Sequence, residues 1–302
     1  MSREAAFIAA LRGLARHPAA RGLLDDAAVL DGLVLTHDMI AEGVHFLPDD
    51  PAGDVAWKLV AVNLSDLAAK GAAPAGVLLG YALAADSRWE TDFLAGLDAV
   101  LAAYDVPLLG GDTVSLPAGA PRTLGLTAIG RTEGPAPSRT GARPGDALYV
   151  TGTIGDAGAG LAMAQGLIAA DPVLLAAYRR PTPRLADGRA LAPVVHAMMD
   201  VSDGLLLDAA RMAEASGVAI AIELEAVPLS DGYRALNGDG REARLSAATA
   251  GDDYQLLFAA PAAAALPVPA TRIGAVTAGD GLSIRHHGEA VAPPARLGYL
   301  HG

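Results

Sequence analysis

The stretch WKLVAVNLSDLAAKGAAP, residues 57–74, decides the fold class, because it predicts a long helix that stops before a further element begins. Gly71 and Pro74 supply the stop, since glycine and proline commonly follow the end of a helix. Asp66 lies opposite the apolar side of the helix, four residues before Lys70. The apolar residues that recur at helical spacing are Trp57, Val60, Ala61, Leu64, Leu67 and Ala68.

Strands and helices alternate on both sides of this helix. Upstream, AAVLDGLVLT predicts a β-hairpin, because Asp31-Gly32 suits the positive φ angles of a type I′ turn. Downstream, WETDFLAGLDAVLAAYD predicts a helix, and PLLGGD and TLGLTAIG predict strands. The second half is expected to contain a strand at ALYVTG, a helix after GTIGDAGAG, a strand at AMMDVS, a helix at DGLLLDAARMAEASG, and strands at VAIAIEL and DYQLLFAA. Such alternation predicts an α/β (α+β) protein of two domains.

A change in composition separates the two halves. Residues 131–146, RTEGPAPSRTGARPGD, are dense in Gly, Pro, Ser and Arg, as linkers are. We therefore expect an N-terminal domain over residues 1–137 and a C-terminal α/β domain over residues 138–302. A chain of 302 residues is long enough for two domains of ordinary size.

The composition excludes several classes of function. The formal net charge is -12, and Lys58 and Lys70 are the only lysines, so nucleic-acid binding through a basic surface is not expected. The absence of cysteine excludes disulfides and thiolate catalysis. No apolar run is long enough to span a membrane, and the N-terminal MSREAAFIAALRGLARHP predicts an amphipathic helix and not a signal peptide. We expect a cytoplasmic protein.

Aspartates stand near the ends of several expected elements. Thr36 and Asp38 are two residues apart on one strand and therefore share a face. Mg²⁺ is bound by a few carboxylates together with waters and substrate phosphates, so the aspartates could jointly bind it. The aspartates concerned are Asp25, Asp26, Asp38, Asp66, Asp112, Asp200 and Asp203.

Five of these aspartates also have a simpler explanation. Asp203 could cap the helix that follows it. Asp66 could pair with Lys70 on a solvated helix face. Asp112 could be a turn residue, and Asp25-Asp26 could be a surface pair. The residues alone leave these alternatives open.

Motifs of other enzyme classes are missing. The glycines of GTIGDAGAG, residues 152–160, do not match a dinucleotide-binding loop, and the chain contains no P-loop. The loop could still bring backbone amides to a phosphate, or its glycines could serve close packing. The sequence has neither H-E-x-x-H nor G-x-S-x-G, so zinc hydrolases and serine hydrolases are not expected.

A series of segments nevertheless occurs in a familiar order and spacing. They are DDAAVL, THDMIAEGVHF, WKLVAVNLSDLAAKGA, LLGGDT, SRTGARPGDALYVTG, DVSDGLLLDAA and AGDDYQLLF. From Leu24 to Tyr299 the chain resembles the thiamine-monophosphate kinase family, which is grouped with aminoimidazole ribonucleotide synthetase and selenophosphate synthetase. The most specific parts are VNLSDLAA, GGDT and SDGLLLD.

This resemblance implies ATP-dependent phosphorylation of thiamine monophosphate to thiamine diphosphate, with several Mg²⁺ ions and ATP as co-substrate. It also implies the two-domain aminoimidazole ribonucleotide synthetase fold, in which the N-terminal sheet domain forms a homodimer and the site is shared across it. The catalytic residues would be Asp38, Asp112 and Asp203. Matched to metal binding are Asp26, Thr36, His37, Asp38, Asp66, Asp112, Asp200 and Asp203. Matched to ATP are Gly111, Asp112, Arg139, Ser202 and Tyr104, and matched to the acceptor are His45, Asp252 and Tyr299.

The chain departs from the family pattern at a few positions. His37 replaces a small hydroxyl residue, Lys70 replaces a frequent methionine, and Asp252 replaces a glutamate and reaches one methylene less. The altered His37 and Asp252 keep open a non-catalytic sensor of Mg²⁺ and nucleotide. A second alternative is another ATP-dependent synthetase of the same superfamily.

The charge balance fits phosphoryl transfer. Two unit negative charges about 4 Å apart repel by about 4 kcal/mol at an effective dielectric near 20, so bringing two phosphates together needs neutralising charge. With only two lysines in the chain, metal ions are expected to supply most of it. A phosphate oxygen is already ionised, so direct transfer needs no general base.

Overall fold

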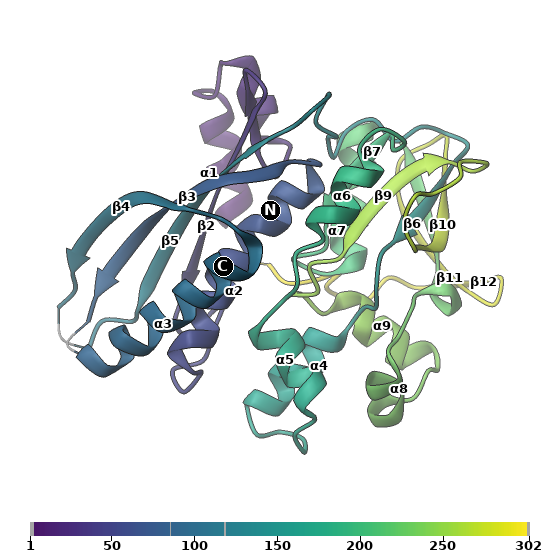
Figure 1. Cartoon of the computed structure of the whole chain (residues 1–302). Coiled ribbons are helices and arrows are strands. Elements are labelled where there is room, and N and C mark those ends of the chain that lie inside the picture. Colours follow the sequence, from purple (N-terminus) through teal and green to yellow (C-terminus); the bar gives the residue numbers. More distant parts are fainter. Residues whose placement is uncertain (1–2, 85, 118, 301–302) are drawn as a thin grey trace.

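The computed structural model describes residues 3–84, 86–117 and 119–300, and within these residues the chain forms two β-sheets (Figure 1). A five-stranded sheet has the order β1-β2-β5-β3-β4, and a seven-stranded sheet has the order β12-β11-β8-β10-β6-β9-β7. The first sheet comprises β1 Ala28–Leu30, β2 Leu33–Ala41, β3 Ala73–Leu83, β4 Leu108–Ser115 and β5 Thr123–Arg131. The second comprises β6 Asp146–Val150, β7 Ala197–Asp200, β8 Ala219–Glu223, β9 Leu256–Pro261, β10 Thr271–Thr277, β11 Gly281–His286 and β12 Glu289–Val291.

Helices and strands both occur in each half of the chain, which confirms the predicted α/β class. In the N-terminal part they are α1 Arg3–Arg12, α2 Ala52–Ala69 and α3 Ser87–Tyr104, with a 3-10 segment at Pro18–Leu23. In the C-terminal part they are α4 Asp156–Ala164, α5 Pro172–Arg179, α6 Leu185–Leu191, α7 Leu205–Ser216, α8 Asp231–Asn237 and α9 Arg241–Thr249, with a 3-10 segment at Leu224–Ala226. None of the described helices is both long and apolar enough to cross a membrane.

The predicted hairpin forms as expected. Leu30 pairs with Leu33, and the two residues between them, Asp31 and Gly32, have φ angles of 51° and 80°. Positive φ at both positions is the geometry of a type I′ turn, which matches the twist of the strands. The strand predicted at DYQLLFAA starts only at Leu256, because Asp252 and Tyr254 adopt left-handed φ angles of 68° and 49° and are not extended.

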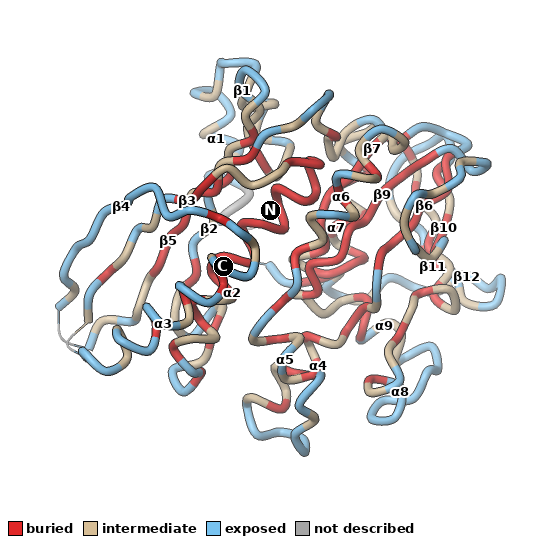
Figure 2. The backbone as a smooth tube through the Cα atoms, viewed as in Figure 1, coloured by how far each residue is buried: buried red, intermediate tan, exposed pale blue. Residues whose placement is uncertain are grey.

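Helix α2 is buried on nearly all sides because it lies between the two halves of the molecule. One side packs on the first sheet through residues such as Leu59 and Leu64. At its C-terminal end, Ala68 and Ala69 pack against Met198 and Phe258 of the second sheet. In Figure 2 the tube at α2 is largely red, in contrast to the exposed strand β4. Polar side chains on α2 therefore face the junction between the halves.

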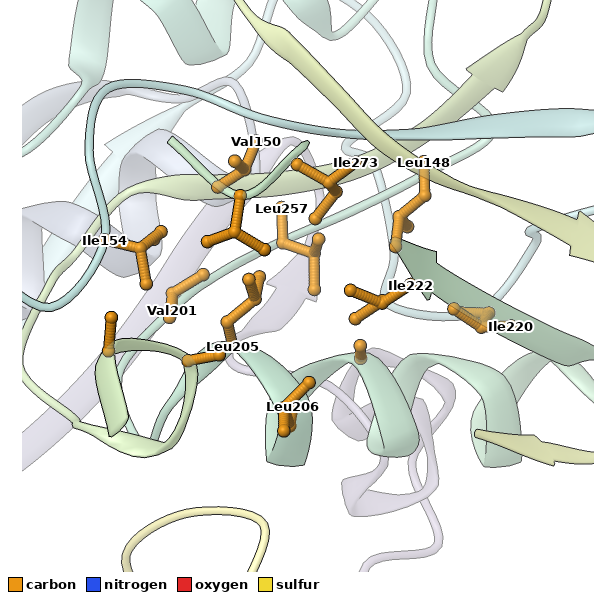
Figure 3. Close-up of a cluster of buried hydrophobic side chains, with 14 of the residues drawn as sticks. Leu148, Val150, Ile154, Val201, Leu205, Leu206, Ile220, Ile222, Leu257 and Ile273 are labelled. Carbon is orange, nitrogen blue, oxygen red and sulfur yellow. The ribbon is translucent and has the colours of Figure 1, made fainter. Parts of the chain in front are cut away.

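The C-terminal core lies between α7 and the second sheet (Figure 3). Leu205 and Leu206 of α7 are fully buried against Ile222 and Leu257 of the strands. This packing fixes the turn that joins β7 to α7. Residues 132–145, between the two sheets, are all described and none of them is in a helix or strand. The boundary that we predict after residue 137 falls in this segment.

Candidate active site

Three buried aspartates meet where the two halves join. Asp26 precedes β1, Asp66 lies in the last turn of α2, and Asp200 is the last residue of β7. One carboxylate oxygen of each lies within 4.8 Å of the others. We call these three residues the acidic cluster. An all-carboxylate donor set is typical of sites for hard divalent cations such as Mg²⁺.

Helix α2 and strand β2 hold the acidic cluster in place. The Thr36 hydroxyl on β2 donates a hydrogen bond to Asp66, and the Ser65 hydroxyl on α2 donates one to Asp200 over 2.6 Å. The main-chain N–H of Asp38 donates to the Asn63 side-chain oxygen over 3.0 Å. Strand β2 thus fixes the carboxylate of α2, and α2 in turn fixes a carboxylate of the second sheet and the main chain of Asp38.

Among the described residues, the carboxyl groups of Asp38, Asp66 and Asp200 form no ion pair with a cation of the chain. Burial, together with repulsion from Asp26 and Asp203, raises the pKa of Asp38 to about 6. Burial and repulsion from neighbouring aspartates raise the pKa of Asp200 to about 8 and raise that of Asp66 well above its usual value. Groups of like charge in a dry site resist ionisation, so this side of the site favours binding a cation.

Asp26 has the opposite environment. Burial alone would raise its pKa, but Lys70 and Arg139 outweigh burial and lower it. Its Oδ2 atom accepts a bond from Lys70 Nζ over 2.8 Å, and its Oδ1 atom accepts one from the Arg139 guanidinium. Asp26 is therefore an ionised carboxylate whose charge is already balanced within the chain.

Asp25 ties the segment between the sheets to this site. Its side chain is 1% exposed and accepts hydrogen bonds from Arg21 over 2.5 Å and from the Ser138 hydroxyl over 2.8 Å. Lys70 donates to it as well. The alternative that Asp25 and Asp26 form a surface pair is wrong, because strong cationic partners stabilise both inside the fold.

The turn after β7 carries a further aspartate, Asp203, toward the acidic cluster. Asp203 accepts a bond from Arg211 over 2.5 Å, and Ser202 is half-buried beside it. Asp208, within α7, accepts the main-chain N–H groups of Ser202 and Asp203 over 3.1 Å each. The helix-cap alternative for Asp203 is wrong, because Gly204 is the N-cap of α7, no described side chain caps that helix, and the Asp203 carboxylate pairs with Arg211. Asp208 thus holds the turn that carries Ser202 and Asp203.

The three residues matched to the acceptor lie around the same turn. The Asp252 N–H donates to the Ser202 carbonyl over 2.8 Å, and the Tyr299 N–H donates to the Asp203 carbonyl over 2.8 Å. Lys58 Nζ joins Asp252 to the His45 main chain, with 2.7 Å to the Asp252 carboxylate and 2.9 Å to the His45 carbonyl. His45 in the first half and Asp252 in the second are thus linked by one lysine.

The residues of the GGD segment do not reach the acidic cluster in a single chain. Gly111 and Asp112 lie on β4, the exposed edge of the first sheet, and Asp112 is in the middle of a strand and not in a turn. In the strand register β5 and β3 stand between Asp38 and β4, which separates the backbones by about 14 Å at the usual strand spacing. Tyr104, at the end of α3, packs edge-on against Trp57 with ring centroids 5.9 Å apart.

The structure contradicts two expectations, that the His37 side chain belongs to the metal site and that Asp66 forms a solvated pair with Lys70. Side chains alternate along a strand, so His37 points away from Thr36 and Asp38, where it bonds Thr127 over 2.9 Å. Its side chain does not join the acidic cluster. The solvated pair of Asp66 with Lys70 is also wrong, because Asp66 is 7% exposed and the Lys70 amine bonds Asp25 and Asp26.

The glycine-rich loop before α4 serves close packing. A Cβ at Gly155 would lie 2.6 Å from Ala247 Cβ, and a Cβ at Gly158 would lie 2.6 Å from Ala250 Cβ. The glycines allow α9 to approach the start of α4, which favours the packing alternative over phosphate binding.

Sequence reasoning missed four residues that organise the site. Ser65 and Arg211 gave no signal of their own, because a serine in a helix and an arginine two turns into α7 are common. Lys58 and Lys70 did carry a signal, since the only two lysines of an acidic chain stand on one helix. The structure places both against aspartates at the junction.

Comparison with known proteins places the chain among ATP enzymes that share this fold. Residues 24–132 match the model of the N-terminal domain of AIR synthase related proteins, and residues 143–287 match that of the C-terminal domain. The thiamine-monophosphate kinase of Caulobacter vibrioides is 41% identical over 97% of this chain and 88% of its own length. That of Escherichia coli K12 is 39% identical over 89% of this chain and 88% of its own length.

Solved structures agree with these relatives. A structure described as "AaThiL complexed with AMPPCP and TMP" superposes with a TM-score of 0.86 at 30% identity, over 97% of this chain and 96% of that one. The thiamine-monophosphate kinase of Stenotrophomonas maltophilia superposes with a TM-score of 0.76 at 39% identity, over 94% of this chain and 95% of that one.

Proposed function

The chain belongs to the thiamine-monophosphate kinase family of AIR synthase related proteins, and from that premise we propose the details of its reaction. It transfers the terminal phosphoryl group of ATP to thiamine monophosphate and yields thiamine diphosphate and ADP. The observation that carries the chemistry is the meeting of buried carboxyl groups at the junction of the two halves, where oxygens of Asp66 and Asp200 lie within 4.8 Å of each other and, among the described residues, neither side chain forms an ion pair.

The donor set of the site fits Mg²⁺. Asp38, Asp66, Asp200 and Asp203 offer carboxylate oxygens, and Thr36 offers a hydroxyl beside them. These residues would hold the metal. When bound, Mg²⁺ supplies positive charge that offsets repulsion between the phosphates and stabilises the charge spread over the transferring group.

The remaining residues of the site bind and orient the two substrates. Arg139 bonds Asp26 and the Ser202 N–H bonds Asp208, and these two residues, Arg139 and Ser202, are our candidates for nucleotide contacts. Asp252 and Tyr299 bond the turn at Ser202 and Asp203, and Lys58 links His45 to Asp252. His45, Asp252 and Tyr299 are our candidates for the acceptor. The attacking phosphate oxygen is ionised at neutral pH, so the reaction requires no general base from the chain.

The site is completed by a second copy of the chain. All residues of β4 are exposed, including the apolar Leu109 and Val114 at 56% and 54%. An exposed apolar edge strand is suited to pairing with another chain. We infer a homodimer formed by this sheet, in which Asp112 and Gly111 of the partner subunit complete the nucleotide site.

One incubation tests the activity. The purified protein is mixed with Mg²⁺, ATP and thiamine monophosphate, and the nucleotides and thiamine phosphates are separated by chromatography. We expect thiamine diphosphate and ADP in equal amounts. Phosphate release without an acceptor would indicate a phosphohydrolase, and ATP binding without any product would indicate a sensor. Turnover only with a different acceptor would indicate a sister synthetase.

A further inference from the structure

Lys70 is a buried cation beside the acidic cluster. It follows the last residue of α2 and is 0% exposed. Its amine donates to Asp25 and, over 2.8 Å, to Asp26, and it lies 3.4 Å from the Met198 carbonyl. All three acceptors are fixed by the fold, so the position of the ammonium group is fixed as well.

The contacts of Asp26 differ from those of its neighbours. Both of its oxygens are bonded to cations of the chain, one to Lys70 and the other to Arg139. Among the described residues, neither Asp66 nor Asp200 forms an ion pair, and each accepts a hydroxyl hydrogen bond. A metal ion that used Asp26 would either share an oxygen with the Lys70 ammonium or the Arg139 guanidinium, whose positive charge repels it, or displace one of them.

Breaking such a pair is costly. Removing one partner of a buried ion pair leaves the other charge unpaired in a medium that solvates it poorly. Asp66 and Asp200 have no such competitor. A divalent ion therefore gains more from the Asp66 and Asp200 carboxylates than from Asp26.

We propose that the Lys70 ammonium is a permanent cation of the site and neutralises Asp26 in place of a metal ion. Asp26 is then a positioning residue, and divalent ions bind to Asp38, Asp66 and Asp200. This inference rests on the proposed function only in that the site binds divalent cations. It replaces the role expected for Asp26 as a metal ligand. One positive charge of the site is then permanent, and fewer ions are needed to neutralise it.

Metal binding in the absence of substrates tests the inference. Binding of Mg²⁺ is measured by calorimetry and that of Mn²⁺ by electron paramagnetic resonance. For Lys70→Met we expect binding at least tenfold tighter than in the unaltered protein, because Asp26 becomes available and a repelling charge is lost. Lys70→Gln, which keeps a donor but no charge, should behave alike. Asp25 keeps Arg21 and Ser138 as partners in both variants, which favours folding.

A double variant separates the two roles of Asp26. Lys70→Met combined with Asp26→Asn leaves the net charge unchanged, and we expect metal affinity within threefold of the unaltered protein. A loss of tenfold or more in the double variant would show that Asp26 is a ligand and would overturn the inference. Unchanged or weaker metal binding in both folded single variants would overturn it too.

The matched control is Lys58→Met. It removes the other buried lysine of α2, which contacts Asp252 and not the acidic cluster, so metal affinity should stay within twofold. Circular dichroism confirms the fold of each variant. Because no substrate is present, a failure of the kinase assay and a failure of this inference give separate results.

Discussion

At the scale of single residues, the charge of each aspartate is decided by its nearest partner. Asp26 and Asp200 are both buried members of one cluster, but the pKa of Asp26 is lowered by Lys70 and Arg139 whereas that of Asp200 is raised to about 8. Residue type and sequence spacing do not predict that the pKa values of these two aspartates shift in opposite directions. The contacts do, and they divide the site into a side that is neutralised by the chain and a side that requires a cation.

Asp203 is expected to act in catalysis and not in folding. Asp203→Asn keeps the size of the side chain but removes a negative charge from the proposed metal site, so turnover should fall at least tenfold. Steady-state kinetics with thiamine monophosphate measure the loss. The control is Asp231→Asn, an exposed aspartate paired with Arg234 on α8, which should leave turnover unchanged. Near-normal turnover of Asp203→Asn would contradict its assignment.

Lys58 is expected to position the acceptor site. Lys58→Met frees Asp252 and the loop that carries His45 from their common partner. The KM for thiamine monophosphate should therefore rise at least tenfold while kcat changes less, because the reacting groups themselves remain. Lys58→Arg should recover part of the loss, since it keeps the charge.

The control for Lys58 comes from the same helix. Asp54 also bridges the two halves, through Arg180 over 2.5 Å, but Arg180 is half-exposed and solvent weakens the pair. Asp54→Asn should change KM by less than twofold. Equal effects of the two substitutions would mean that Lys58 only helps to hold the halves together.

At the scale of helices and strands, hydrophobic periodicity predicts the elements that pack on one side. It does not predict the burial of an element that packs against two partners. The hairpin, α3, α7 and β5 each have one clear pattern, and the structure confirms them. The helical period predicts α2, but it leaves Asp66 on a side of the helix that could face solvent. A helical period identifies one packed side, and it cannot show that the second half of the chain covers the other.

The same limit applies to the site residues. Thr36 and Asp38 were placed on one face because alternation along a strand is local, and the structure confirms that arrangement. The contacts of Lys70 with Asp25 and Asp26 join residues about 45 positions apart, and those of Lys58 with Asp252 join residues 194 positions apart. Such contacts depend on how the sheets assemble, which no local pattern encodes.

The close crossing of α2 and α3 gives a prediction for packing. A Cβ at Gly96 would clash with the main chain of Gly53 at the start of α2, which cannot move without shifting the helix. Gly96→Ala should lower the free energy of unfolding by about 1–3 kcal/mol, as overpacking does. Urea denaturation measures the change. Gly13→Ala, where a Cβ meets only the Ala10 carbonyl at 3.5 Å, is the control and should be nearly neutral. An unchanged midpoint for Gly96→Ala would show that the helices separate without cost.

At the scale of the whole molecule, the acidic cluster couples stability to pH. The pKa of Asp38 is raised to about 6 and that of Asp200 to about 8 in the folded state, from an ordinary 3.8. Between pH 3.8 and these values the folded state retains protons that the unfolded state has released. Stability therefore falls as pH rises through this window, by at most about 1.4 kcal/mol per pH unit for each group. The opposite contribution of Asp26, whose pKa is lowered, is complete above its ordinary value.

We accordingly expect the Tm of the metal-free protein to fall between pH 5.5 and pH 8.5. Saturating Mg²⁺ should reduce the fall, because the ion binds the ionised carboxylates and stabilises the folded state. Calorimetry with and without chelator measures both curves. Asp200→Asn should flatten the metal-free curve, since the amide does not titrate. An equally steep fall in this variant would assign the pH dependence to other groups.

In the proposed dimer, residues of two chains form each site. Asp112 lies on the exposed strand β4, about 14 Å from the Asp38 backbone at the usual strand spacing, so one chain does not bring the two together. If the proposed dimer supplies Asp112 across its interface, Asp112→Asn and Asp203→Asn damage the same site from different chains. Each variant alone should keep at most about a tenth of the turnover. A mixed dimer would contain one site with both changes and one site with neither.

Mixing the two variants therefore distinguishes the arrangements. Random exchange of subunits should restore roughly a quarter of the sites of the unaltered dimer, because half of the dimers are mixed and each has one intact site. If Asp112 acted within its own chain, every site would carry one change and the mixture would be no more active than the variants alone. Light scattering establishes the dimer, and Leu109→Asp on β4 is the control. An acidic side chain on this apolar edge should yield monomers, and adding such monomers to Asp203→Asn should restore no activity.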